Sequence, residues 1–183
     1  QKEQSPVEVK ANVLVRDLSG NPVDIKAQEL KIYEDDVEQK ITYFAKKEPI
    51  LNLGFVFDNT GSMRTNLDKI IKIPSIFTDN LNDKDEVFIV RFVDSDKVEV
   101  IQDWTSDKGF LIESIENLYV EGGQSAVLDA IYLSAEKILE FERKDKSKRY
   151  AIILFSDAEE RDSYYNLKEV KKLFAGTDLQ IFI

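Results

Sequence analysis

The chain has 183 residues, of which 43% are hydrophobic and 33% charged, and 35 acidic against 25 basic side chains leave a net charge of -10. Domains usually have about 100–200 residues, so we expect one main domain with a small appendage. The acidic balance argues against nucleic acid or an anionic membrane as a partner, because both require a basic surface. Without His or Cys the chain cannot use histidine or thiol catalysis, and any metal must be bound by oxygen. No apolar run approaches the roughly 18–20 residues of a membrane span.

Residues 1–49 predict a small β-rich module. Apolar residues alternate with mostly polar ones over 7–15, as in a half-buried strand, and Ser19 to Pro22 predicts a turn. Short strands are expected over 30–33 and 41–44, with a turn at Glu34, Asp35 and Asp36 between them.

From Ile50 onward, strands and helices alternate. The pattern predicts strands over 51–57, 87–93, 97–102, 150–155 and 179–183, and helices over 67–81, 110–118, 126–139 and 167–174. We expect Pro74 to kink the first helix and the 97–102 strand to form an antiparallel edge after a turn at 94–96. Residues 50–183 therefore predict an α/β domain with a doubly wound, mostly parallel central sheet flanked by helices. The last strand reaches the end of the chain, so we expect a domain that is C-terminally incomplete, lacking its last strand and helices.

Three polar segments follow the predicted strands, where sheets of this type bind ligands. They are Asp58-x-Thr60-x-Ser62, the Gly122-Gly123-x-Ser125 loop, and Ser156-Asp157. Their carboxylates and hydroxyls are hard oxygen donors suited to Mg²⁺, which takes about six oxygen ligands. So few anionic ligands would leave the ion electrophilic and able to recruit a carboxylate from a partner. This arrangement predicts a binding site, and the protein is not expected to be an enzyme.

These segments resemble the von Willebrand factor type A domain and its metal-ion-dependent adhesion site, whose motif is Asp-x-Ser-x-Ser, a Thr in a second loop and an Asp in a third. Here Thr60 and Ser125 depart from the motif but keep the hydroxyl oxygen. The resemblance covers about residues 50–183. It implies Rossmann-like topology and Mg²⁺, with Mn²⁺ or Ca²⁺ possible, bound directly by Thr60, Ser62 and Ser125 and through water by Asp58 and Asp157. It also implies a protein ligand that presents a Glu or Asp carboxylate.

The first 49 residues add to the resemblance. The run from Val13 through Asp17 and Gly20 to Pro22, together with Leu30 to Asp35, is similar to the β-rich lead-in of bacterial von Willebrand A-related proteins. That subgroup is mostly exported, which implies an extracytoplasmic location, whether secreted, periplasmic or cell-surface.

Other interpretations of the same residues remain open. Any one of these Asp or Ser residues, taken alone, could simply cap a helix. Asp129 could either support the metal ligands without touching the metal or lie on a helix surface. Trp104 is expected to pack in the core or at its rim. The acidic run Asp157, Glu159, Glu160 and Asp162 is expected to be a solvated loop. A third possibility is an interaction module of the same family that binds no metal.

The chain also resembles a haloacid-dehalogenase-type phosphatase. In that interpretation Asp58 is the nucleophile, Asp157 and Asp162 hold Mg²⁺, Ser125 binds phosphate, and Lys146 or Lys148 neutralises it. The general acid of that family stands two residues after the nucleophile, where this chain has Thr60, which cannot donate a proton in that way.

Overall fold

The computed structural model describes residues 9, 11, 13–45, 50–142 and 148–183. The chain divides into two compact units, residues 1–47 and 48–183, and each is considered by itself. No helix in the described ranges is both long and apolar enough to cross a membrane.

The described part of the first unit contains one hairpin and little other regular structure. Strands β1 (Ile32–Glu34) and β2 (Val37–Gln39) pair antiparallel, and a one-turn 3-10 helix, η1 (Ala27–Glu29), precedes them. Asp35 and Asp36 connect the strands with φ values of 48° and 64°. Positive φ at both central residues is the signature of a two-residue hairpin turn that matches the twist of the strands. The predicted turn is therefore confirmed, and the strand expected over 30–33 is found slightly later.

Two strands expected in this unit are wrong wherever the structure describes them. Residues 9, 11, 13–15 and 41–44 are not in strands, although Arg16 and Pro22 form an isolated bridge around the predicted turn. Residues 7, 8, 10 and 12 of the first of these strands lie outside the described set. The apolar side chains Val9, Leu14 and Tyr43 are largely exposed. Alternating apolar residues form a strand only when a partner strand and a core cover them, and the described part of this unit provides neither.

The second unit has a five-stranded mixed sheet in the order β5-β4-β3-β6-β7. The strands are β3 (Leu51–Asp58), β4 (Glu86–Phe92), β5 (Val98–Thr105), β6 (Arg149–Phe155) and β7 (Gln180–Phe182). All neighbours pair parallel except β4 and β5, which are antiparallel. The predicted doubly wound, mostly parallel sheet with one antiparallel edge strand is thus confirmed.

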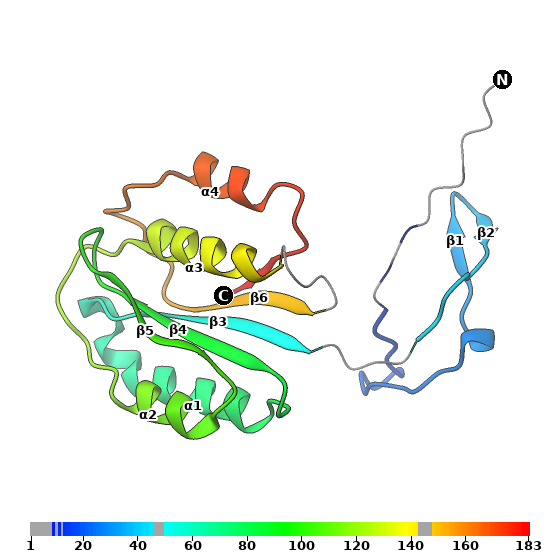
Figure 1. Cartoon of the computed structure of the whole chain (residues 1–183), viewed down its shortest axis with the longest axis horizontal. Helices are drawn as coiled ribbons and strands as arrows, with labels where there is room; N and C mark the ends of the chain where they lie inside the picture. The colour runs from blue at the N-terminus through cyan, green and yellow to red at the C-terminus, as the bar shows by residue number, and fades with distance from the viewer. Residues whose placement is uncertain (1–8, 10, 12, 46–49, 143–147) are drawn as a thin grey trace. The chain divides into compact units, whose positions relative to one another are not determined.

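The helices also follow the predicted pattern. They are α1 (Leu67–Asp79), α2 (Lys108–Glu116), α3 (Val127–Glu142) and α4 (Leu167–Phe174), and the 3-10 segment η2 (Gly61–Asn66) leads into α1. Helix α1 continues through Pro74, and Thr78 donates its hydroxyl to the Pro74 carbonyl 3.0 Å away. Figure 1 shows α1 and α2 on one side of the sheet and α3 and α4 on the other.

Each face of the sheet has its own apolar core. Phe55 and Phe57 of β3 pack toward α1 and α2, where Ile70 and Leu111 are buried against them. On the opposite face, side chains of β4 and β6 pack against α3 and α4. Trp104 of β5 belongs to this second core, because the centre of its ring lies 4.6 Å from the ring centre of Phe88 and 5.2 Å from that of Phe141. The expectation that Trp104 packs on the core is confirmed.

The strand register sets the place of the candidate site. Asp58, the last residue of β3, pairs with Phe92 at the end of β4, and Phe57 pairs with Phe155 at the end of β6. The three central parallel strands therefore end at one edge of the sheet, and the polar segments that follow β3 and β6 start there together.

Candidate functional site

The first polar loop is organised by the carboxylate of Asp58. This side chain is buried, and its Oδ1 accepts hydrogen bonds from the Thr60 amide at 2.9 Å and from Thr60 Oγ1 at 2.6 Å. Thr60 Oγ1 also lies 3.1 Å from Ser62 Oγ. The Asp-x-Thr-x-Ser spacing thus places Thr60 in contact with both the Asp58 carboxylate and the Ser62 hydroxyl.

The third polar loop reaches the same carboxylate through Ser156. Its hydroxyl donates to Asp58 Oδ2 over 2.6 Å and accepts a hydrogen bond from the Ala158 amide at 2.8 Å. Sequence reasoning did not include Ser156 among the candidate ligands. The available signal was its position directly after an apolar strand, but a serine at such a place is also a common turn residue. Asp157, the predicted ligand beside it, is exposed, and its Oδ1 accepts from the Glu159 amide at 3.2 Å.

The second loop crosses the ends of β3 and β4. The Glu121 amide donates to the Asn59 carbonyl at 2.7 Å, and the Ser125 amide donates to the Val93 carbonyl at 2.9 Å. Gly123 makes this approach possible, since a Cβ atom there would overlap Val93 Cγ1 and lie 2.9 Å from Val93 O. The two glycines were predicted to form a loop before α3. Of the two, Gly123 is therefore the one that the close packing on Val93 requires.

Ser125 itself is unusual in two ways. Its φ of 68° lies in the left-handed region, which costs a non-glycine residue about 1–2 kcal/mol. Its side chain is only 4% exposed, and its Oγ has no hydrogen-bond partner among the described residues. An unpaired buried hydroxyl costs about 1–3 kcal/mol. The strained backbone and the unpaired hydroxyl of Ser125 both lower stability, and residues of this kind cluster at functional sites.

The second and third loops are joined to each other. The Ser125 carbonyl accepts from the amides of Arg161 and Asp162, both at 3.1 Å. At the start of α3, Asp129 accepts from the amides of Tyr164 and Tyr165 at 2.9 and 2.8 Å. Asp129 is 7% exposed, so it does not lie on the helix surface, which was one of the two open interpretations. Its carboxylate holds the backbone of the third loop.

The acidic run in the third loop has mixed roles. Asp157, Glu159, Glu160 and Asp162 are all exposed, as expected for a solvated loop. Two of them nevertheless make long-range bonds, because Glu160 accepts from the Leu128 amide at 2.9 Å and Asp162 accepts from Ser95 Oγ at 3.1 Å. These bonds attach the loop to α3 and to the turn after β4.

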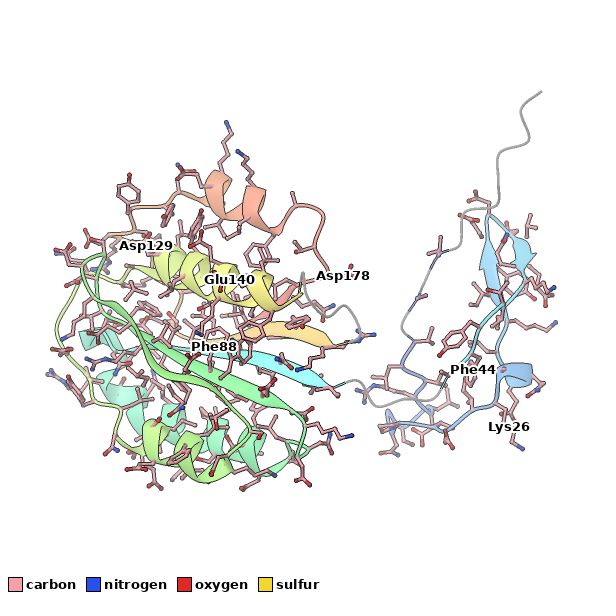
Figure 2. All side chains as sticks on the ribbon, viewed as in Figure 1. Lys26, Phe44, Phe88, Asp129, Glu140 and Asp178 are labelled. Atoms are coloured by element: carbon pink, nitrogen blue, oxygen red, sulfur yellow. The ribbon has the colours of Figure 1, made fainter. Side chains whose placement is uncertain are left out.

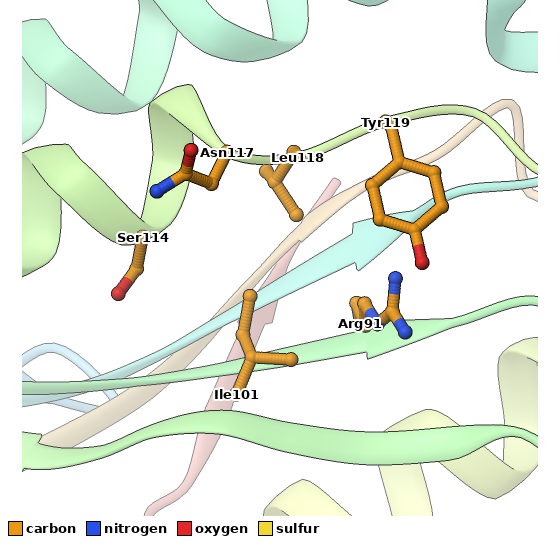
Figure 3. A pocket seen from close by; sticks show the side chains of 6 residues that line it. All are labelled: Arg91, Ile101, Ser114, Asn117, Leu118 and Tyr119. Atoms are coloured by element: carbon orange, nitrogen blue, oxygen red, sulfur yellow. The ribbon is translucent and has the colours of Figure 1, made fainter.

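A cavity of about 300 Å³ is lined by residues of α2, of the segment that follows α2, and of strands β4 and β5 (Figure 3). It is lined by Arg91, Ile101, Ser114, Asn117, Leu118 and Tyr119. The Arg91 guanidinium lies 5.0 Å from the centre of the Tyr119 ring and pairs with Glu99 at 2.7 Å. Burial of Arg91 opposes its charge, but hydrogen bonds to Tyr119 and Glu99 outweigh this and raise its pKa. Asn59, which sequence reasoning passed over, connects the cavity wall to the site by donating its side-chain amide to the Tyr119 carbonyl.

The donor set fits a hard cation. Asp58, Thr60, Ser62, Ser125 and Asp157 offer only oxygen, and the orphaned Ser125 Oγ is a hydroxyl that lacks a partner within the described chain. Thr60 donates its hydrogen to Asp58 and can accept one from Ser62, which leaves one lone pair of Thr60 Oγ1 available. In the described ranges no three acidic side chains come together as a possible metal site, so a cation at these loops would need hydroxyl ligands as well as carboxylates.

Comparison with known proteins agrees with the fold. The model of the von Willebrand factor type A domain family matches residues 53–160, whereas no curated protein sequence matches the chain. Solved structures with the same fold include BatB from Bacteroides thetaiotaomicron (20% identity, TM-score 0.58, covering 72% of this chain and 64% of that one). An aerotolerance-related membrane protein from Bacteroides fragilis is similar (19% identity, TM-score 0.59, 72% and 65%). So is the vWF domain of the pilus tip protein Mfa5 from Porphyromonas gingivalis (16% identity, TM-score 0.52, 63% and 40%).

The chain spans less than two thirds of the length of each of these structures. At such low identity they establish the fold alone, while the family match covers more than half of the chain and includes Asp58, Ser125 and Asp157. Domains of this kind are typically interaction or adhesion modules. The chain belongs to the von Willebrand factor type A domain family.

Proposed function

We propose that this domain is a divalent-metal-dependent protein-binding module. Thr60, Ser62 and Ser125 would hold Mg²⁺ directly, and Asp58 and Asp157 would hold it through water. Mn²⁺ or Ca²⁺ could take the same place. When bound, the ion supplies a Lewis-acidic position that accepts a Glu or Asp carboxylate from a protein partner. The observation that carries the proposal is the buried, unpaired hydroxyl of Ser125 in a strained backbone conformation.

The contacts of Asp58 support its indirect role. Both of its carboxylate oxygens already accept hydrogen bonds, Oδ1 from Thr60 and Oδ2 from Ser156. A carboxylate engaged in this way orients the neighbouring hydroxyls and leaves their lone pairs for the ion. The Asp58 carboxylate would also attract a cation to this edge of the sheet without neutralising it by direct contact, which would leave the cation able to accept an external carboxylate.

The phosphatase alternative receives less support. It requires Asp157 and Asp162 to hold Mg²⁺ beside the nucleophile Asp58, but the described residues contain no cluster of three acidic side chains that could hold a metal. Asp162 is instead bonded to Ser95, and the Asp58 oxygens are occupied, which makes Asp58 a poor nucleophile. A module that binds no metal would leave the Ser125 hydroxyl buried without any function to offset its cost.

We also propose an extracytoplasmic location. Structures with the same fold include a pilus tip protein and a membrane protein related to aerotolerance. The lead-in of residues 1–49 resembles that of exported proteins of the same family.

Calorimetric titration of Mg²⁺ into EDTA-treated protein tests the proposal directly. The wild-type chain is expected to bind one Mg²⁺ with a dissociation constant in the millimolar range or below. Ser125→Ala removes the orphaned hydroxyl and should weaken binding at least about tenfold, which corresponds to a loss of about 1.4 kcal/mol.

Ser106→Ala is the matched control, because Ser106 is an exposed serine before α2. It should bind Mg²⁺ like the wild type. If the wild-type protein takes up no Mg²⁺, Mn²⁺ or Ca²⁺ at millimolar concentration, the metal-dependent function is wrong. Turnover of generic phosphoesters that disappears in Asp58→Asn would instead favour the phosphatase.

A further inference from the structure

We infer that Asp129 is a positioning residue of the metal site. Its carboxylate fixes the loop that carries Asp157 against the start of α3, and thereby sets the distance between that loop and Ser125. This inference rests on the proposed function, since it concerns the same metal. Asp129 is not a ligand itself, because both of its oxygens are bonded to backbone amides.

The first support is the geometry of the carboxylate. Oδ2 accepts from the Tyr164 amide at 2.9 Å and Oδ1 accepts from the Tyr165 amide at 2.8 Å. The partners are 35 and 36 residues away in sequence, so these bonds join two separate parts of the chain. Figure 2 shows Asp129 toward one end of α3, with Glu140 toward the other.

The second support is a reciprocal set of bonds from the loop to the helix. Ser163 Oγ accepts from the amides of Leu128 and Asp129 at 3.0 and 3.2 Å, and Glu160 accepts from the Leu128 amide at 2.9 Å. The amides at the start of a helix lack partners within the helix, and here the third loop supplies them. The loop and the helix start are therefore bonded in both directions.

The third support is the position of Ser125 within this arrangement. Its carbonyl accepts from Arg161 and Asp162, in the middle of the same loop. Ser125 and Asp129, which are four residues apart in the chain, thus bind the third loop at two points. The ring of Tyr165 is stacked on that of Tyr132 in α3, with 3.6 Å between ring centres, and this stacking continues the attachment beyond Asp129. Displacing the loop at one point would displace the Ser125 and Asp157 side chains relative to each other.

The chemistry requires a carboxylate at residue 129. Two amides point at two oxygens, and an Asn side chain offers only one oxygen and places an NH₂ donor against the second amide. Asp129→Asn therefore keeps the size of the side chain and disrupts half of the attachment. Groups that orient metal ligands without touching the metal typically change affinity by about 10- to 100-fold when they are replaced.

The experiment compares Asp129→Asn with Glu140→Gln, an equivalent carboxylate-to-amide change at an exposed position on the same helix. Calorimetric titration with Mg²⁺ should give a dissociation constant about 10-fold or more above the wild type for Asp129→Asn and no change for Glu140→Gln. Hydrogen exchange of the metal-free proteins should show faster exchange at the Tyr164 and Tyr165 amides in Asp129→Asn only.

The outcomes separate this inference from the proposed function. A wild-type protein that binds no metal overturns both. Wild-type binding with an unchanged constant in Asp129→Asn, even alongside a lower melting temperature, overturns the positioning role alone and leaves Asp129 a purely structural residue. If Asp129→Asn does not fold, Ser163→Ala takes its place, because it removes the reciprocal acceptor. It must then weaken Mg²⁺ binding in the same direction, and an unchanged constant would again contradict the inference.

Discussion

Ser156 donates a hydrogen bond of 2.6 Å to the buried carboxylate of Asp58, which lies 98 residues earlier in the chain. The two residues stand at the ends of the neighbouring parallel strands β6 and β3. Through this bond both the first and the third polar loop contact the Asp58 carboxylate. The two loops are therefore joined to each other without a ligand.

Ser156→Ala should lower the free energy of unfolding by about 1–3 kcal/mol, because a buried carboxylate loses a hydrogen-bond donor. Urea denaturation measures this as a lower midpoint at an unchanged slope. The exposed Ser106→Ala is the control and should leave the midpoint unchanged. Equal midpoints for both variants would mean that water replaces the Ser156 hydroxyl at no cost.

The adjacent glycines 122 and 123 should respond very differently to alanine. A Cβ atom at Gly123 would overlap Val93, whereas a Cβ atom at Gly122 would meet no heavy atom within 4 Å. We expect Gly123→Ala to cost about 1–3 kcal/mol of stability and Gly122→Ala to be nearly neutral. Thermal or urea denaturation of the pair is the measurement. Similar losses in both variants would contradict the close packing of this loop on Val93.

Tyr164 and Tyr165 form a second matched pair. Tyr165 stacks on Tyr132, while the Tyr164 side chain is 83% exposed. Tyr165→Ala should lose about 0.5–1.5 kcal/mol from the aromatic contact, in addition to the loss of buried area, and Tyr164→Ala should lose clearly less. Both variants keep the backbone amides that bond to Asp129. A larger destabilisation in Tyr164→Ala would show that the stacked pair does not hold the loop.

The ion pair between Lys137 and Asp103 predicts a pH dependence. The hydrogen bond from Lys137, aided by the Trp104 amide, holds the pKa of Asp103 below its ordinary value of 3.8. A depressed folded-state pKa stabilises the protein above the unfolded value, and this stabilisation is lost as the pH falls through the folded value. Wild type should therefore exceed Asp103→Asn in melting temperature near pH 6 by a small margin, because Asp103 is largely exposed.

Below pH 3.8 that margin should shrink toward zero. Melting curves of the two proteins between about pH 2 and 6 follow this difference, and added salt should reduce it. A margin that grows on acidification would have the wrong sign and would exclude the ion pair as its cause.

Addition of Mg²⁺ should stabilise the wild-type fold by mass action. At a free concentration 100 times the dissociation constant, the gain is about 2.7 kcal/mol, which shifts the melting temperature by about 5–10 °C. Ser125→Ala should lose most of the shift and yet, without metal, melt at or slightly above the wild-type temperature, because it removes a buried unpaired hydroxyl. A metal-free variant that melts far below the wild type would show that the hydroxyl has a stabilising partner.

Local patterns predicted most elements of the second unit. A short, mostly apolar run such as 51–57 favours a strand covered on both faces, and the helices between the strands show apolar residues at helical spacing. In the first unit the strands predicted over 7–15 and 41–44 are absent wherever the structure describes these residues, because an apolar pattern forms a strand only if a partner strand pairs with it. For Asp129 the residue type allowed several roles, and only its two bonds to the third loop distinguish them.

The sequence alone determined the α/β fold class, the exclusion of histidine and cysteine ligands, and the position of three oxygen-rich loops after predicted strands. These features depend on composition and on the period of apolar residues, which are local. The tertiary structure decided that Ser156 shares the carboxylate of Asp58, that the Ser125 hydroxyl is buried without a partner in the described chain, and that Asp129 holds the third loop. Such relationships join residues 35 to 98 positions apart, and no local pattern encodes which long-range hydrogen bonds the packed loops will form.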